Sequence, residues 1–189
     1  MQDGLVKLGI DADSPNNLVY ANGKLVGDTK GGAISKPLPN GVYYFNENDG
    51  SVKGQMVTGK TTVVDDGETY YYYFDKTTGR AVTDIVKDGV VYGHDGERID
   101  AEDGNTNAIV TLDHDTYYNK KVTNDTLYKN EYIAANSNII VSSAGKLRTS
   151  GTVKVDGVKY KVVPASNYVD NASTPADETV WTVVQVDED

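Results

Sequence analysis

The sequence predicts an all-β protein made of short β-hairpin repeats, and three observations support this fold class. Val and Tyr are abundant, with 25 and 14 residues against 8 Leu, and branched and aromatic side chains suit the half-buried surface of a strand. Several of the 19 Gly follow Asn or Asp, a pairing that tolerates the positive φ angles of tight hairpin turns. No stretch shows the apolar periodicity of an amphipathic helix.

A short motif recurs along the first hundred residues. In residues 40–54, an Asn-Gly pair precedes the run Val-Tyr-Tyr-Phe, and a Gly follows after a few polar residues. Residues 66–83 repeat this order with Asp-Gly and a longer Tyr run, and residues 18–27 and 90–99 hold shorter versions. Each copy predicts an aromatic strand, a turn and a short return strand. Because a lone hairpin is marginal in water, we expect neighbouring hairpins to stack into a β-solenoid.

The motif weakens in the second half of the chain. Degenerate copies are predicted around residues 116–118, 138–149 and 159–163, and an alternating strand is predicted at 180–186. We therefore predict repeats over residues 1–100, followed at 101–189 either by degenerate repeats or by a small separate β domain.

Composition excludes several classes of function. The net charge is −10, which disfavours the phosphate backbone of nucleic acid and anionic lipid surfaces. The chain has no Cys, so disulfides, thiolate zinc sites and cysteine nucleophiles are excluded. Its apolar runs are too short for a bilayer-spanning segment, and no membrane insertion is expected.

The repeated Tyr-Tyr-Phe run, with its Asn-Gly or Asp-Gly turn and its following Gly, resembles the cell-wall-binding repeat superfamily of Gram-positive bacteria. That superfamily includes choline-binding modules, glucan-binding repeats and the receptor-binding repeats of clostridial toxins. The resemblance implies a hairpin solenoid that binds surface glycan between hairpins, in an extracellular, cell-surface location as part of a larger exported protein. Choline is not expected, because aromatic cages for quaternary ammonium favour Trp and the single Trp181 lies outside the repeats.

The ligand-binding residues implied by this resemblance are aromatic side chains, whose rings stack on sugars while Tyr hydroxyls supply hydrogen bonds. They are Tyr43, Tyr44, Phe45, Tyr71, Tyr72, Tyr73, Phe74 and Tyr92. Since successive strand residues point to opposite faces, part of each run must form the core. We expect the exposed alternates to be the best candidates.

No catalytic residue, metal site or cofactor is predicted. His114 lies between Asp113 and Asp115, which suits a proton carrier, but no nucleophile or ligand partner stands at an interpretable spacing. Residues 11–17 place oxygen ligands at alternating positions, yet they lack the Gly and the terminal Glu of a calcium loop. We interpret both segments as surface turns.

The predicted function is therefore a noncatalytic module that binds cell-wall polysaccharide or another surface glycan. The alternative is a structural stalk or adhesin segment that binds a protein partner or spaces another domain.

Overall fold

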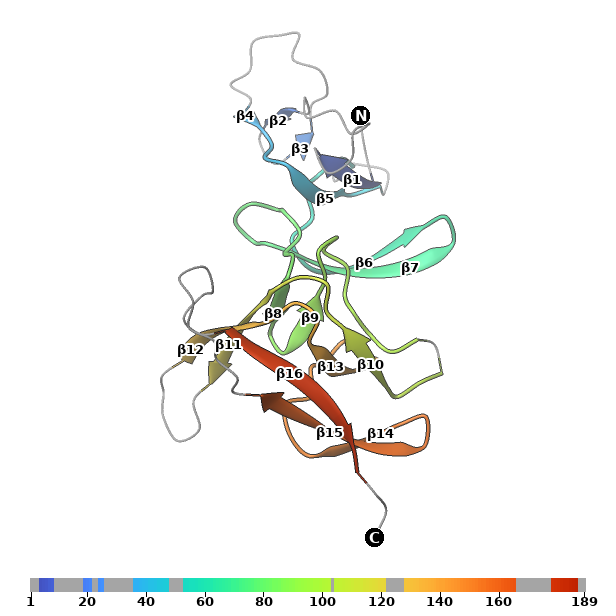
Figure 1. Ribbon diagram of the computed structural model, residues 1–189. Coiled ribbons are helices and arrows are strands. Elements are labelled where there is room, and N and C mark those ends of the chain that lie inside the picture. Colours follow the sequence, from blue (N-terminus) through green and yellow to red (C-terminus); the bar gives the residue numbers. More distant parts are fainter. Residues whose placement is uncertain are drawn as a thin grey trace. The chain divides into compact units, whose positions relative to one another are not determined.

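The computed structural model describes residues 4–8, 19–21, 24–25, 36–47, 53–102, 104–121, 128–165 and 178–186. These residues form sixteen strands and no helix (Figure 1), which confirms the all-β prediction. Within the same ranges, no helix has the length and apolar character needed to cross a membrane. The calcium-like segment at 11–17 lies outside the described residues.

Two compact units make up the chain, Met1–Val82 and Thr83–Asp189. In the first, β1 pairs with β5, β6 pairs with β7, and β2 lies between β3 and β4. The strands are β1 Gly4–Leu8, β2 Val19–Ala21, β3 Lys24–Leu25, β4 Lys36–Pro37, β5 Gly41–Phe45, β6 Gly59–Asp65 and β7 Glu68–Phe74.

Strand β5 organises the core of the first unit. On one face, Tyr43 and Phe45 pack with Val6 and Leu8 of β1. On the other, Val42 belongs to a second cluster, which also contains Val63, Tyr72, Phe74 and Ala81. Burial on both faces explains why this strand is apolar at nearly every position.

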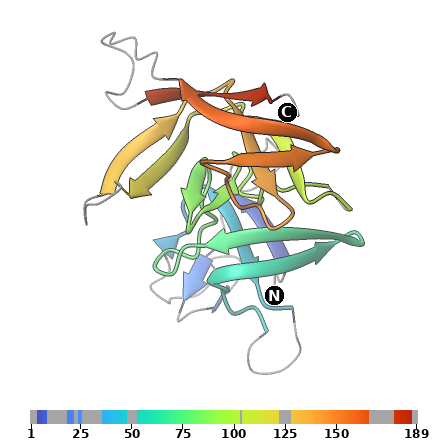
Figure 2. The same ribbon diagram turned by 90° about the horizontal axis from the view of Figure 1, so that it is seen from below.

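The second unit contains a mixed seven-stranded sheet in the order β14-β15-β16-β12-β11-β8-β9, together with the pair β10–β13. Figure 2 draws the strands of this unit in colours from green through yellow and orange to red. Its strands are β8 Ile85–Lys87, β9 Val90–Tyr92, β10 Asn107–Thr111, β11 Thr116–Lys121, β12 Tyr128–Ile133, β13 Asn138–Ser142, β14 Thr152–Val155, β15 Val158–Ala165 and β16 Glu178–Gln185. One apolar cluster, which includes Ile139, Ile140, Val141 and Trp181, forms the core of this unit.

The Asp-Gly pairs form tight hairpin turns, as the sequence predicts. Three of them join β6 to β7, β8 to β9 and β14 to β15. Both residues of each pair have positive φ, as in Asp66 (49°) and Gly67 (84°), the conformation that a two-residue hairpin turn of type I′ requires.

The Asn40-Gly41 pair behaves differently, and its prediction as a hairpin turn is wrong. The preceding β4 pairs with β2, whereas the following β5 pairs with β1. The chain therefore passes from one sheet to another at this point, so these two residues join no pair of neighbouring strands.

In four predicted copies, a single antiparallel bridge stands in place of the expected return strand. The bridges are Phe45↔Met56, Phe74↔Ala81, Tyr92↔Arg98 and Val141↔Leu147, and the first of them lies two residues beyond the predicted copy at 40–54. In the copy at residues 18–27, β2 pairs with β3. These pairings confirm local hairpins, distributed over several small sheets, and the stacking of the hairpins into one solenoid stays a prediction.

Candidate functional site

Six of the eight aromatic side chains expected to bind ligand are buried. Their exposed fractions are 0% for Tyr43, Phe45 and Phe74, 1% for Tyr72, 3% for Tyr92 and 9% for Tyr73. A ring with so little exposed area cannot stack on a sugar. In the structure, these six side chains therefore pack in the protein interior.

Fewer alternate residues are exposed than strand alternation predicts, because apolar side chains cover both faces of some strands. In β5, Tyr43 and Phe45 lie in one cluster while Val42 lies in another. In β7, Tyr72 and Phe74 are buried on one face, and Tyr73 is buried on the other.

Apart from Tyr73, the residues on this second face of the β6–β7 hairpin are exposed. Tyr71 lies directly opposite Thr62 in the strand register, and Val64 lies opposite Thr69. The exposed fractions are 37% for Tyr71 and 63% for Val64. Since Lys60 lies two residues from Thr62 on the same face, this hairpin surface combines an aromatic ring, hydroxyls and an ammonium group. We call Lys60, Thr62, Val64, Thr69 and Tyr71 the hairpin face.

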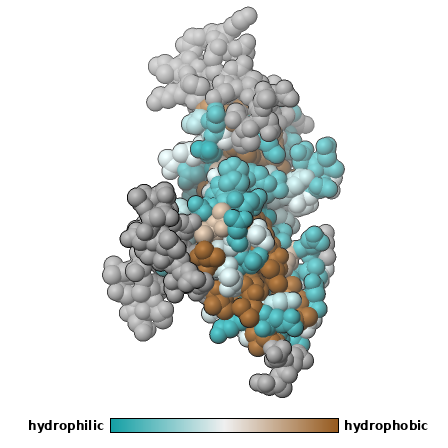
Figure 3. Space-filling model, in the orientation of Figure 1, coloured by the Kyte–Doolittle hydropathy of each residue, from teal (hydrophilic) through white to brown (hydrophobic). Residues whose placement is uncertain are grey.

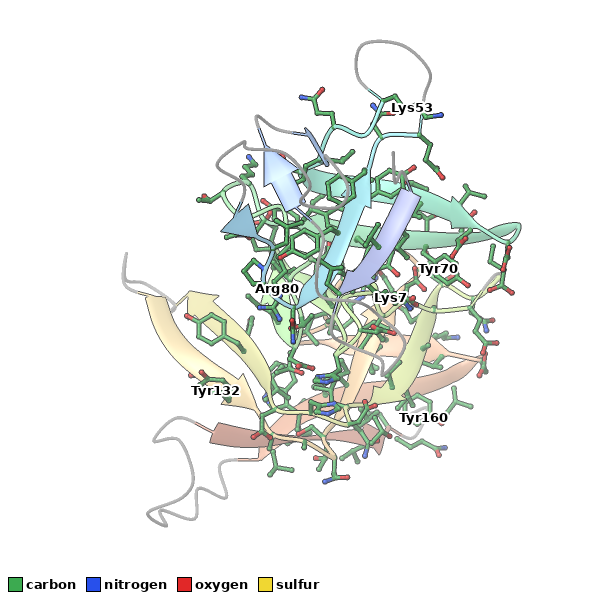
Figure 4. The ribbon with its side chains drawn as sticks, turned by 90° about the horizontal axis from the view of Figure 1, so that it is seen from above. Lys7, Lys53, Tyr70, Arg80, Tyr132 and Tyr160 are labelled. Carbon is green, nitrogen blue, oxygen red and sulfur yellow. The ribbon has the colours of Figure 1, made fainter. Side chains whose placement is uncertain are left out.

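Two half-exposed tyrosines border the core on the opposite side of the same hairpin. Tyr44 and Tyr70 both pack against the cluster that contains Phe74, and Tyr70 is labelled in Figure 4. The Tyr44 hydroxyl donates a hydrogen bond to Glu47 Oε2 at 2.9 Å, and the Tyr70 hydroxyl donates one to Glu68 Oε2 at 2.6 Å. Of the expected site residues, Tyr44 and Tyr71 are thus the two that retain exposed area.

Burial raises the pKa of Tyr44 to about 12, and the Glu47 carboxylate adds to the rise through its hydrogen bond and its charge. Because this folded-state pKa exceeds 10.0, Tyr44 contributes stability that is fully present below pH 10 and declines as the pH rises toward 12. We expect Glu47→Gln to lower the pKa of Tyr44 but to leave it above 10.0, since burial is the larger cause.

The measurement is the difference in tyrosinate absorbance between the wild-type chain and Tyr44→Phe during an alkaline titration, repeated in the Glu47→Gln background. Glu68→Gln, which changes the partner of Tyr70 instead, is the matched control and should leave the Tyr44 titration unchanged. An ordinary tyrosine titration of Tyr44 in the wild-type chain would contradict the predicted burial.

A second group of functional side chains comes together in the other unit. Asp84, His94 and His114 each offer a metal-ligand atom, and these atoms lie within 4.8 Å of one another. His94 Nδ1 lies 2.8 Å from Asp84 Oδ2. The rings of His94 and His114 stack with centroids 3.9 Å apart and planes inclined by 9°.

Sequence reasoning did not find this group. Its members are separated by ten and twenty positions, which matches no short metal-binding motif. In the sequence, His114 lies in an acidic turn between Asp113 and Asp115, and nothing local connects it with His94 or Asp84. The only available signal was that the chain has just 2 His, and a residue count cannot show that two side chains meet.

Comparison of the chain with protein families, with curated proteins and with solved structures finds no significant match.

Proposed function

We propose that the chain is a noncatalytic module of an exported surface protein, and that it binds cell-wall polysaccharide or a related glycan through the hairpin face. The repeated aromatic hairpins and their resemblance to cell-wall-binding repeats support the class of function. The observation that carries the proposal is the exposed Tyr71 on an otherwise well-packed hairpin.

The packing of the hairpin suits it to present a binding surface. Val63, Tyr72 and Phe74 anchor its inner face in the core, which holds the outer face in a defined conformation. A rigid aromatic ring loses little conformational entropy on contact with a ligand. Tyr71 therefore offers a ring face for the C–H surface of a sugar.

Polar groups on the hairpin face complement this ring. Thr62 is the cross-strand partner of Tyr71, and hydroxyls can both donate and accept hydrogen bonds with sugar hydroxyls. Lys60, exposed in the structure, adds three N–H donors. A single face of this size binds weakly, and we propose that several hairpins contribute to retention on a polymeric wall through multivalency.

The test is retention of the purified chain on Gram-positive cell walls and on insoluble glucan. We expect Tyr71→Ala to weaken retention about tenfold, which corresponds to roughly 1.4 kcal/mol of lost contact. Tyr71→Phe, which keeps the ring, should retain most of the binding. The free energy of unfolding should fall by less than about 1 kcal/mol in either variant, because Tyr71 is a surface residue.

The matched control is Tyr132→Ala, which removes a half-buried tyrosine from the second unit and should leave retention unchanged. Equal retention of the wild-type chain and Tyr71→Ala would refute the assignment of the hairpin face. Release of the bound chain by choline would overturn the exclusion of a choline ligand.

A second candidate function is a structural or adhesin segment that contacts a protein, and an apolar sheet surface favours it. On the outer face of β15 and β16, the exposed fractions of Val163, Val180 and Val184 are 37%, 40% and 50%. Figure 3 shows hydrophobic residues gathered in the area where Figure 1 draws these strands. Failure of the folded chain to bind any wall or glucan would favour this candidate.

A further inference from the structure

The topology of the second unit brings three distant segments together at the ends of β8, β9 and β11. Strand β8 pairs antiparallel with β9, so that Ile85 lies opposite Tyr92. It also pairs parallel with β11, so that Ile85 lies opposite Tyr117. The residue before β8, the turn after β9 and the turn before β11 must therefore lie together, and these positions contain Asp84, His94 and His114.

Backbone hydrogen bonds hold Asp84 between the other two segments. Its N–H donates to the Gly93 carbonyl oxygen at 3.1 Å, and its own carbonyl oxygen accepts from the Tyr117 N–H at 2.8 Å. Asp84 has a φ of 47°, a conformation that is uncommon for a residue other than Gly. The carboxylate thus projects from a point that is anchored on both sides.

The two histidine turns are also held by hydrogen bonds. In the turn that carries His94, the Gly93 N–H donates to the Glu97 carbonyl oxygen at 2.8 Å. In the turn that carries His114, the Thr116 hydroxyl donates to the His114 carbonyl oxygen at 3.2 Å. The neighbouring Asp115 accepts a hydrogen bond from the Ala135 N–H at 2.8 Å. These contacts place both imidazoles on ordered backbone.

From this geometry we propose that Asp84, His94 and His114 bind one divalent transition-metal ion, with Zn²⁺ as the representative case. Two imidazoles and a carboxylate form a donor set that suits Zn²⁺, Co²⁺, Ni²⁺ or Cu²⁺, whereas Ca²⁺ and Mg²⁺ prefer oxygen ligands alone. The side chain of His94 is 67% exposed, so an ion can reach the site from solvent.

Small side-chain movements suffice to complete the coordination. The three ligand atoms lie within 4.8 Å of one another, whereas two atoms that each sit about 2.1 Å from a zinc ion are separated by roughly 3–4 Å. Rotation of the exposed His94 ring would adjust these distances, and it would lengthen the 2.8 Å separation between His94 Nδ1 and Asp84 Oδ2. Three protein ligands in a tetrahedral site leave one position for water or for an oxygen atom of a partner.

Binding is measured by calorimetric titration of the full chain with ZnCl₂, and by the visible absorption of added Co²⁺. We expect one ion per chain, removal of the ion by EDTA, and displacement of Co²⁺ by Zn²⁺. Absence of saturable binding by a chain that circular dichroism shows to be folded would overturn the proposal.

Four variants identify the ligands. We expect His94→Gln and His114→Gln each to weaken zinc binding by more than about 100-fold, because loss of even an outer-shell partner costs 10–100-fold. Asp84→Asn should weaken it at least about tenfold. Asp113→Asn is the matched control, since this acid adjoins His114 in sequence but is not in the cluster, and it should change the affinity less than about twofold. Unchanged affinity in both histidine variants would place the ion elsewhere and refute the site.

A measurement on the wild-type chain keeps the test decisive if a variant fails to fold. The chain has only 2 His, so a nitrogen NMR spectrum of labelled imidazoles reports these two rings alone. We expect ring-nitrogen signals of both histidines to shift when ZnCl₂ is added and to return after EDTA. A spectrum in which neither ring responds to zinc would refute the proposal.

Discussion

Replacement of Phe74 with Ala is expected to destabilise the first unit by about 3–5 kcal/mol. Phe74 is fully buried, and its ring stacks on Tyr72 at 5.5 Å and on Tyr44 at 6.3 Å between centroids. Truncation removes these contacts and leaves a cavity that neighbouring strands cannot fill without moving. Because small domains are stable by only about 5–15 kcal/mol, this loss is a large part of the total. Urea unfolding followed by far-UV circular dichroism measures it.

Tyr71→Ala is the matched control for this experiment. Tyr71 lies in the same strand, three residues from Phe74, but on the exposed face. Its truncation should cost less than about 1 kcal/mol. If Phe74→Ala were as stable as Tyr71→Ala, the assignment of the two hairpin faces to core and surface would be wrong.

Trp181→Ala is expected to destabilise the second unit by a similar amount, about 3–5 kcal/mol. The Trp181 side chain is only 2% exposed and meets Tyr118 edge to face, with centroids 5.8 Å apart. The Trp181 backbone N–H donates to Ser137 Oγ at 2.9 Å. The indole therefore fills the core at the point where β16 approaches the segment before β13.

Differential scanning calorimetry is suited to this variant, because the substitution removes the only Trp and with it the tryptophan fluorescence signal. Val184→Ala provides the control, since Val184 belongs to the same strand and is 50% exposed. We expect its melting temperature to stay close to that of the wild-type chain. A Trp181→Ala chain that melts at the wild-type temperature would remove Trp181 from the core.

Features that depend on neighbouring residues were predictable. The Asp-Gly pairs at residues 66–67, 88–89 and 156–157 form tight turns, because the conformational preference of a turn pair is local. The strands that flank these pairs were predictable for the same reason, from their branched and aromatic side chains. The four return bridges follow the predicted order of strand, turn and short second strand.

Features that depend on pairing between distant strands were not predictable. Alternation along β5 indicates two faces but cannot show which of them β1 covers, and packing against Val6 and Leu8 of β1 removes Tyr43 and Phe45 from the ligand candidates. The Asn40-Gly41 pair resembles the other turn pairs, yet it connects strands of different sheets. In both cases the outcome depends on β1, which precedes β5 by more than thirty residues.

The same distinction between local features and long-range features applies to the candidate sites. Composition and turn chemistry alone define an acidic, Cys-free, all-β chain with recurrent aromatic hairpins, because these properties belong to single residues or to short segments. Only the tertiary structure selects Tyr71 as an exposed ring and brings Asp84, His94 and His114 within ligand distance. The physical reason is that exposure and proximity depend on which strands pair, and pairing is decided by long-range packing rather than by the local sequence.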